Sequence, residues 1–597
     1  MKAKIHFIII LISMMSYVSW AEEPVYFADA NLKAAVEETL GIADPVPADM
    51  LRLTVLFANK RKITDLTGME YAFNLQQLAV HENQISDISP LSGLTNLHTL
   101  ALFGNRISDI SLLSALTNLQ KLFLSRNQIS DISPLSGLTN LKELTLYRNQ
   151  VTNISALAQL TNMESLGLTE NQISDIAILD GLKKLTSLEL GYNQISDISA
   201  LADLTNLTHL QLFNNNISDI SALAQLTNME YMVLSGNQIR DISVLAGMTK
   251  IVTLELPRNQ ISDISVLAGM TNLTSLSLYD NQISDISPLS GLLKLQILSL
   301  GRNLISDISD ISELTNLQNL SIYENQISDI SPLANFSSLQ YLTLYKNQIS
   351  DISSLSGLNN LQNVLLNNNQ ISDILPLSGL INLKSLWIFR NQISDISPLS
   401  SLTNLRDLLI DYNQIIDLSS LSGLINLQTL RLNGNLISDL WQLSELTNLQ
   451  SLSLNENLIS DISPLSGLTN LQYLLLGGNL ISDISPLSEL TKLRTLNLPE
   501  NQISDLSALT ELTSLEYLYI NSNQISDISV LIVLTNLKWV NLNNNQISDI
   551  FPLVELQNLS SLDLQGNPLT QEACDIYIPK IIENNPNITI NYDPCSN

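Results

Sequence analysis

The 597 residues carry a formal net charge of −29, with 28 Lys and Arg against 57 Asp and Glu, and 45% of them are apolar. A single domain rarely reaches this length, so several domains or a repeat array are expected. The negative charge argues against nucleic acid as a partner, because its phosphates would be repelled. Four His and two Cys are few for a metal site or a nucleophile, and we predict no metal, no cofactor and no enzymatic activity.

Residues 1–21 have the features of a secretory signal. A charged start precedes an apolar run over residues 5–12, and Ser19 and Ala21 lie at the −3 and −1 positions of the expected cleavage site. A membrane anchor usually needs about 20 apolar residues, and this run is shorter. We expect cleavage after Ala21 and a mature chain without a membrane span. It would be secreted or associated with the cell surface, in an extracellular or periplasmic compartment.

Residues 22–74 are predicted to form a helical N-terminal cap and an irregular first coil. The stretch from Phe27 to Gly41 has apolar residues at helical spacing, a capping Asp29 and a terminal glycine. A second, shorter helical stretch is expected over residues 49–53. A cap is needed because the first coil of a repeat array would otherwise expose core side chains and an open strand edge.

From residue 75 the sequence repeats every 22 residues, and we call each 22-residue coil a rung. Asparagine recurs 23 times in this register, from Asn83 to Asn567, together with apolar positions that begin at 75, 78, 80, 85, 88, 91 and 94. The pattern L-x-x-L-x-L-x-x-N-x-L is that of the leucine-rich repeat, whose rungs bury a shared core. We therefore predict an α/β repeat solenoid over residues 75–570, with 22 full repeats and a partial last one. It would be a right-handed superhelix with a parallel concave β-sheet and mostly 3₁₀ turns on the convex side.

Two polar columns accompany the apolar ones. The amide of Asn83 and its equivalents can pair with backbone groups of adjacent rungs, so this column is expected to be buried and structural. Asp87 recurs in 21 rungs, with Asn153 and Gln571 as the exceptions, and is expected to cap the following turn. The alternative for the aspartates is a carboxylate ladder that binds Ca²⁺, although each rung offers one carboxylate.

Residues 571–597 are predicted to close the C-terminal end of the array. Residues 572–584 have a helical pattern. Cys574 and Cys595 are the two cysteines of the chain, and in an oxidising compartment we expect them to form a disulfide.

Aromatic residues concentrate on the side of the rungs that points away from the core. The positions equivalent to Gln77, Ala79, His81 and Glu82 are about 15% of the chain, yet they hold 17 of its 30 aromatic residues. Strand propensity alone could explain this, and so could a recognition surface of large, rigid side chains. The densest group, here named the aromatic cluster, comprises Tyr323, Tyr341, Tyr345, Trp387, Phe389 and Tyr412, flanked by Lys346 and Arg390. A secondary patch comprises Tyr473, Tyr517, Tyr519 and Trp539.

The acidic and imidazole groups on the same face are too scattered for catalysis. His81 and His209 lie six rungs apart, and Glu189 and Glu255 lie three rungs apart. At about 4.8 Å per rung, neither pair can act on one substrate group. We interpret all four as isolated, solvated side chains.

The segment at 83–97, nearly repeated at 127–141 and 457–471, reads Asn-Gln-Ile-Ser-Asp-Ile-Ser-Pro-Leu-Ser-Gly-Leu-Thr-Asn-Leu. It resembles the 22-residue internalin-type repeat of bacterial secreted and surface proteins. Residues 63–71, which follow the first helix, are similar to the N-terminal cap of that family. The resemblance implies a concave face that grips a host protein, with ligands that differ between members.

These features together predict a secreted, monomeric binding protein. Its partner would be a macromolecule, a protein by preference, recognised through the aromatic-rich concave face in adhesion or surface interaction. Two alternatives stay open: a structural component of an envelope or extracellular matrix, and a carbohydrate-binding protein that uses the same face.

Overall fold

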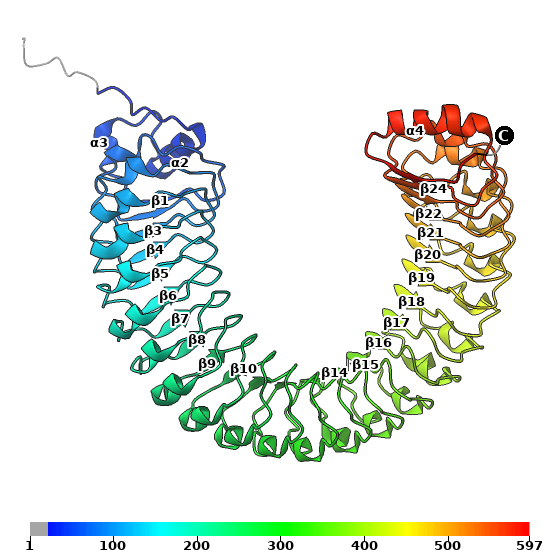
Figure 1. Ribbon diagram of the computed structural model, residues 1–597, viewed down its shortest axis with the longest axis horizontal. Coiled ribbons are helices and arrows are strands. Elements are labelled where there is room, and N and C mark those ends of the chain that lie inside the picture. The colour runs from blue at the N-terminus through cyan, green and yellow to red at the C-terminus, as the bar shows by residue number, and fades with distance from the viewer. Residues whose placement is uncertain (1–21, 596–597) are drawn as a thin grey trace, which may run out of the picture. The chain divides into compact units, whose positions relative to one another are not determined.

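The computed structural model describes residues 22–595, so the predicted signal over residues 1–21 lies outside the described residues. The chain divides after Leu273 into two compact units. In each unit the short parallel strands stack side by side on one side of the rungs, and the 3₁₀ turns lie on the other (Figure 1). The predicted leucine-rich-repeat solenoid is confirmed.

The first unit contains ten strands within residues 22–273, each three residues long and paired in parallel with the next at a 22-residue register. They are β1 Val55–Phe57, β2 Gln77–Ala79, β3 Thr99–Ala101, β4 Lys121–Phe123, β5 Glu143–Thr145, β6 Ser165–Gly167, β7 Ser187–Glu189, β8 His209–Gln211, β9 Tyr231–Val233 and β10 Thr253–Glu255.

The second unit contains fifteen strands within residues 274–595, again parallel. They are β11 Ser275–Ser277, β12 Ile297–Ser299, β13 Asn319–Ser321, β14 Tyr341–Thr343, β15 Asn363–Leu365, β16 Ser385–Trp387, β17 Asp407–Leu409, β18 Thr429–Arg431, β19 Ser451–Ser453, β20 Tyr473–Leu475, β21 Thr495–Asn497, β22 Tyr517–Tyr519, β23 Trp539–Asn541, β24 Ser561–Asp563 and β25 Thr589–Asn591.

The core consists of the apolar columns that the repeat predicts. Leu78, Val80 and Ile85 have no exposed surface, and their equivalents in later rungs are buried likewise. Phe336 takes a leucine position and is fully buried. Because every rung repeats the same side chains at the same depth, each buries the apolar surface of its neighbours.

The asparagine column pairs with backbone groups as predicted. Asn105 Oδ1 accepts from the backbone N–H of Ile85 at 3.0 Å, and its Nδ2 donates to the carbonyls of Val80 and Leu102. The column is not buried throughout, because Asn83 and Asn105 are 8% exposed while Asn127 and Asn325 are only half-buried. The asparagines of different rungs thus have the same backbone hydrogen bonds in common, but not the same degree of burial.

The aspartate column caps the turns on the far side of each rung. In all 21 rungs the Asp Oδ1 accepts from the backbone N–H two residues later, at 2.8–3.0 Å. Asn153 makes the same bond to Ser155 at 2.8 Å. Most of the turns that follow are 3₁₀ helices of three or five residues, such as η2 Ser89–Leu91, which carries Pro90.

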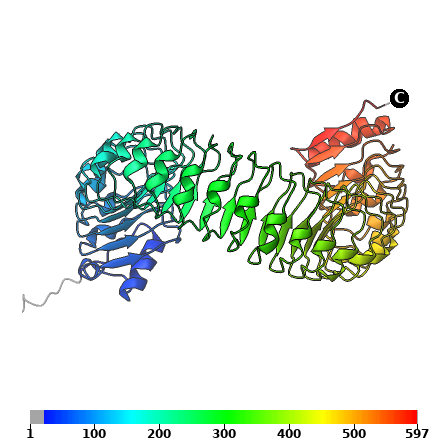
Figure 2. The same cartoon turned by 90° about the horizontal axis from the view of Figure 1, so that it is seen from below.

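The N-terminal end is closed by two helices that lie at the outer end of the first unit's stack (Figure 2). Helix α2 spans Ala30–Leu40; Asp29 accepts from two backbone N–H groups at its start, and Gly41 ends it in a left-handed conformation. Asp29 also accepts from the backbone N–H and hydroxyl of Thr64, which ties the helix to the first coil. The second helix, α3 Pro47–Met50, is four residues long and begins and ends earlier than the predicted stretch.

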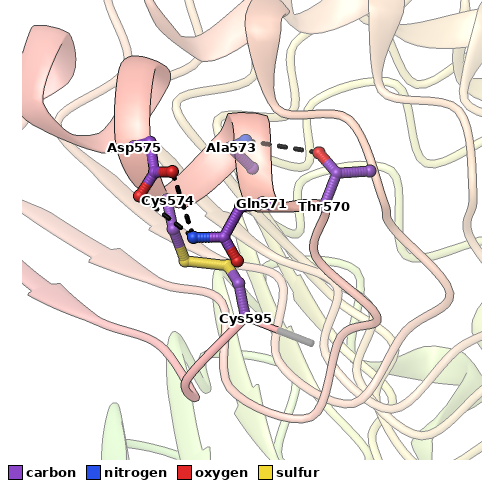
Figure 3. The surroundings of a disulfide bond; sticks show 6 residues. All are labelled: Thr570, Gln571, Ala573, Cys574, Asp575 and Cys595. Carbon is purple, nitrogen blue, oxygen red and sulfur yellow. Dashed lines mark hydrogen bonds between the residues drawn. A yellow bond between two sulfur atoms is a disulfide. The ribbon is translucent and has the colours of Figure 1, made fainter. Parts of the chain in front are cut away.

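The C-terminal end is closed by helix, strand and disulfide. A π-helical turn, η24 Ala573–Tyr577, leads into α4 Ile578–Asn584, and β25 then adds to the sheet beside β24. Cys574 and Cys595 form the predicted disulfide, with Cα atoms 6.2 Å apart (Figure 3). Gln571 does not cap a turn like the aspartates; its amide donates to the carboxylate of Asp575.

Candidate ligand-binding face

The strand face of each unit presents the aromatic residues that the repeat register singles out. Every one of the seventeen keeps exposed surface. In the second unit Tyr341 is 44% exposed, Trp387 37% and Tyr412 41%. The rings are therefore accessible to a partner.

The strands are three residues long, so only part of the aromatic cluster lies on them. Tyr341 and Trp387 are on strands β14 and β16, but Tyr345 and Phe389 follow those strands by two residues. Tyr412 lies in the turn and has a left-handed backbone, with φ of 52°. Of the four outward positions of each rung, those equivalent to Gln77 and Ala79 lie on the strand, and those equivalent to His81 and Glu82 follow it.

Two members of the aromatic cluster stack on each other. The rings of Tyr323 and Tyr345 are 4.6 Å apart between centroids with an interplanar angle of 16°. Tyr323 in turn lies over Gly301, where a β-carbon would approach its Cε1 to 2.4 Å. The stack extends over three adjacent rungs and presents ring edges and hydroxyl groups to solvent.

A second pair closes the other end of the aromatic cluster. The guanidinium carbon of Arg390 lies 5.4 Å from the ring centroid of Tyr412, within the range of a cation–π contact. The same ring covers Gly434, where a β-carbon would come within 2.3 Å of Tyr412 Cδ1. Arg390 is thus held in position by an aromatic surface.

In the middle of the aromatic cluster, leucine side chains stand beside the aromatic ones. Trp387 is in register with Leu365 on β15 and with Leu409 on β17. Phe389, two residues after Trp387, is half-buried. Leu365, Trp387 and Leu409 therefore stand in one row across three adjacent strands, between the Tyr323–Tyr345 stack and the Arg390–Tyr412 contact. A search for aromatic residues alone does not find the two leucines.

Lys346 is not a free flanking charge. Its ammonium lies 3.0 Å from Glu324, whose carboxylate also pairs with Arg302 at 3.1 Å. Of the two flanking cations, Arg390 is the one whose charge is not paired with a carboxylate within residues 22–595. Arg390 is therefore the flanking cation that is available to pair with an acidic group of a partner.

A buried polar ladder borders the aromatic cluster, and the sequence analysis did not identify it. Asp411, 1% exposed, accepts from the backbone N–H and the side-chain amide of Asn433, at 2.9 and 2.6 Å. Asn433 accepts from the backbone N–H of Asn455, and Asn455 accepts from that of Gly477. Burial raises the pKa of Asp411 above its ordinary value, and Arg431 lies 3.2 Å from its second oxygen. A run of small polar residues in a column of aromatics is the signal that could have revealed this ladder.

The secondary patch is more open. Tyr473 and Trp539 are each 44% exposed and Tyr517 is 36% exposed. The rings of Tyr519 and Trp539 are 6.5 Å apart with an interplanar angle of 39°. The structure therefore brings these two together, while Tyr473 lies two rungs from Tyr517.

In the first unit His81, His209 and Glu189 are not the isolated side chains that the sequence predicted. His81 stacks on Phe103 at 4.0 Å, and His209 lies over Tyr231 at 5.9 Å. Burial raises the pKa of Glu189, with the charge of His209 on the neighbouring strand acting in the opposite direction. Within residues 22–595 no group of three or more His, Cys, Asp or Glu side chains is placed to hold a metal ion.

The comparisons with known proteins agree with this geometry. The family described as Leucine Rich repeats (2 copies) matches most of the chain, at residues 73–115, 117–159, 139–181, 161–203, 183–225, 205–247, 271–313, 315–357, 359–401, 447–489, 491–532 and 535–573. The chain belongs to the leucine-rich repeat family. No curated protein matches its sequence.

Solved leucine-rich repeat proteins from plants and bacteria have a similar fold. One is the ectodomain of the membrane receptor kinase GASSHO1/SCHENGEN3 from Arabidopsis thaliana, in complex with CASPARIAN STRIP INTEGRITY FACTOR 2 (21% identity, 92% of this chain and 82% of that one, TM-score 0.55). Another is a leucine-rich repeat protein of Leptospira interrogans (24%, 66% and 93%, TM-score 0.50). An internalin of Listeria monocytogenes is 33% identical over 65% of this chain and 98% of that one, with a TM-score of 0.40.

Among the helices of residues 22–595, none combines the length and the apolar character that crossing a membrane requires.

Proposed function

We propose that this leucine-rich repeat protein is a non-enzymatic binding protein that captures a protein partner on its strand face. The observation that carries the proposal is the exposure of large aromatic rings around Trp387, held in place by stacking and by the leucines beside it. Preorganised aromatic side chains lose little entropy on binding and contribute most of the energy of protein interfaces.

The composition of the face favours a protein over a repetitive structural role. Rings, a cation and aliphatic side chains meet between Tyr323 and Tyr412, whereas near-identical rungs that served only as a spacer would need none of them. The same fold carries a bound partner in the Arabidopsis ectodomain. The resemblance of residues 83–97 and their copies to the internalin-type repeat supports a bacterial surface or secreted setting, and the disulfide of Cys574 and Cys595 fits an oxidising compartment.

The test compares two triple variants of the mature chain. Alanine at Tyr345, Trp387 and Phe389 removes the centre of the aromatic cluster; alanine at Leu375, Trp441 and Phe551 removes exposed apolar side chains from the 3₁₀ side. Partners captured by the wild-type chain from extracellular protein are identified, purified and measured against both variants.

We expect the first variant to lose binding by at least tenfold and the second to bind as the wild type does. Thermal unfolding should change little in the second variant, because truncation of exposed side chains usually costs within about 0.5 kcal/mol. The first variant also removes half-buried Tyr345 and Phe389, so it should lose more stability and stay folded, which circular dichroism checks. Equal binding by the wild type and the first variant would place the interface elsewhere. Binding to glycans but to no protein, lost in the same variant, would favour the carbohydrate alternative.

A further inference from the structure

A polar hollow lies on the flank of the second unit, at the start of strands whose later residues carry part of the aromatic cluster. Its volume is about 640 Å³, and its walls come from the residues that precede strands β16 to β19. Lys384 and Arg406 stand on adjacent rungs at equivalent positions, followed by Gln428 on the next rung. All three side chains are exposed.

The two cations of the hollow differ from the other Lys and Arg side chains in the same column of the repeat. Lys142 pairs with Glu164 at 3.2 Å on the next rung. Arg494 and Lys538 both pair with Glu516, at 3.9 and 2.6 Å. These carboxylates neutralise their neighbours across one rung, as charge complementarity along a ladder requires.

Lys384 and Arg406 have no such carboxylate within the described part of the chain. The ammonium of Lys384 donates to the amide oxygen of Gln362 at 2.9 Å. Gln428 occupies the place next to Arg406 that Glu164 holds next to Lys142. In a chain with net charge −29, two neighbouring cations facing an open hollow form a local site for an anionic group.

Amide oxygens form the remaining wall. Asn404, Asn426 and Asn448 each donate through Nδ2 to a carbonyl of the preceding rung at 2.8 Å, as does Asn382. Their Oδ1 atoms accept no hydrogen bond within residues 22–595. Elsewhere in this column Asn470 Oδ1 accepts from Lys492 at 2.7 Å, so the oxygen can serve as an acceptor.

The combination of donors and acceptors selects the ligand. Sulfate would gain from Lys384 and Arg406, but it has no O–H group to donate to the four amide oxygens, and phosphate has too few to reach all four. A nucleic acid carries a phosphate at every nucleotide of a long chain, so most of its charge would lie beyond the two cations, against the net negative charge of the protein. A sugar has hydroxyl groups that donate to amide oxygens and, when acidic, carboxylate or sulfate groups that accept from ammonium and guanidinium.

We infer that this hollow binds an acidic carbohydrate. Lys384 and Arg406 hold its carboxylate or sulfate group, and the asparagine oxygens accept from its hydroxyls. The site lies before the strands, whereas the aromatic cluster lies on and after them, so this inference does not rest on the proposed protein-binding function.

Isothermal titration of the full mature chain with a chondroitin sulfate tetrasaccharide and with tetragalacturonate tests the inference. Variant Lys384→Gln with Arg406→Gln removes both charges. Variant Gln428→Glu places a carboxylate on the rung after Arg406, as Glu164 does on the rung after Lys142. The matched control is Arg494→Gln with Lys538→Gln, which removes two cations from the same column that Glu516 already neutralises.

At least one acidic tetrasaccharide should bind the wild-type chain, and its affinity should fall as the salt concentration is raised. Each of the two variants of the hollow should bind it at least tenfold more weakly. The control double variant and the triple alanine variant of the aromatic cluster should bind it as the wild type does, and cellotetraose should not bind.

Any of three results would overturn the assignment. These are no binding of either acidic tetrasaccharide at millimolar concentration, equal loss in the control double variant, or complete competition by inorganic sulfate at equimolar concentration, which would indicate a simple anion site.

Discussion

The ring of Tyr323 lies over Gly301, one rung earlier in the same column, so closely that a β-carbon on the glycine would stand 2.4 Å from the ring. Tyr345 then stacks on the other face of Tyr323 at 4.6 Å. Because Gly301 has no side chain, the Tyr323 ring can occupy the space above it, and this position also determines where Tyr345 stacks.

Gly301→Ala should therefore weaken partner binding without unfolding the protein. The added methyl must displace the Tyr323 ring, which is partly exposed and can rotate outward, so the loss of stability should be smaller than the roughly 1–3 kcal/mol of a clash in a sealed core. Binding affinity of the identified partner and thermal unfolding are measured together. Gly291→Ala is the matched control, since a β-carbon there meets nothing within 4 Å. Unchanged affinity in Gly301→Ala would mean that the stack is not part of the interface.

The repeat register could predict which residues share this face, but not how their rings lie. Tyr323 leans back over the preceding rung, whereas Tyr412 leans forward over Gly434. The direction depends on which neighbour lacks a side chain, and that is a property of pairs of rungs rather than of one repeat. A glycine next to an aromatic residue in the same or the adjacent column is the signal that the sequence does contain.

The pair of Asp411 and Arg431 should respond asymmetrically to mutation. Asp411→Asn keeps the oxygen that accepts from Asn433 and removes a buried charge, so the free energy of unfolding at neutral pH should change by less than about 1 kcal/mol. Arg431→Gln instead leaves the buried carboxylate without its cation and should cost more, about 1–3 kcal/mol. Chemical denaturation of both variants gives the comparison, and the double variant should be no less stable than Arg431→Gln alone.

A pH series would test the same pair. Because the folded pKa of Asp411 is raised, the folded state binds the proton more tightly than the unfolded state. The free energy of unfolding that Asp411 contributes therefore falls as the pH rises from its unfolded pKa, about 3.9, through its raised folded pKa. That dependence should disappear in Asp411→Asn and persist in Arg431→Gln.

The aspartate column predicts acid sensitivity with the opposite sign. The backbone N–H of Ser221 holds the pKa of Asp219 below its ordinary value, and Asp197 and Asp241 are shifted likewise by Ser199 and Ser243. Such groups stabilise the fold above the unfolded pKa of about 3.9, and this stability is lost as the pH falls through their lowered values.

Asn at these three positions should reduce that loss. Asn153 shows that an amide oxygen makes the same capping bond at 2.8 Å, so the variant keeps the caps while it no longer titrates. Thermal unfolding from pH 7 down to pH 2 should show a shallower acid decline in the triple variant, with little difference at pH 7. An identical decline in both proteins would assign acid sensitivity to other carboxylates.

At each end of the array, some features could be predicted from the sequence and others could not. Helix α2 was predictable because Asp29 and Gly41 are local signals at its two ends. The attachment of that helix through Thr64 was not, since it joins residues 35 positions apart outside the 22-residue register. At the other end, the pairing of Cys574 with Cys595 followed from the count of cysteines, while strand β25, which has no repeat signature, was missed.

The disulfide should act as a local lock on the C-terminal rungs. The segment between the two cysteines contains α4 and β25, and β25 pairs with β24 at the end of the sheet. Closing a loop of about 20 residues stabilises by roughly 3 kcal/mol in the chain-entropy description. Because each rung contacts mainly its neighbours, the loss of the bond should loosen the adjacent rungs first.

Cys574→Ser should thus increase amide hydrogen exchange first around Asn545 to Asn567, with the rungs near Asn83 barely affected. Reduction of the wild-type chain should reproduce the pattern, and the double variant with Cys595→Ser should no longer respond to reductant, which serves as the control. Exchange is followed by mass spectrometry on the purified chain, after confirming that its two cysteines are paired. If exchange instead rises equally near Asn83 and Asn545, the rungs unfold as one cooperative block, and the disulfide stabilises the whole array rather than its end.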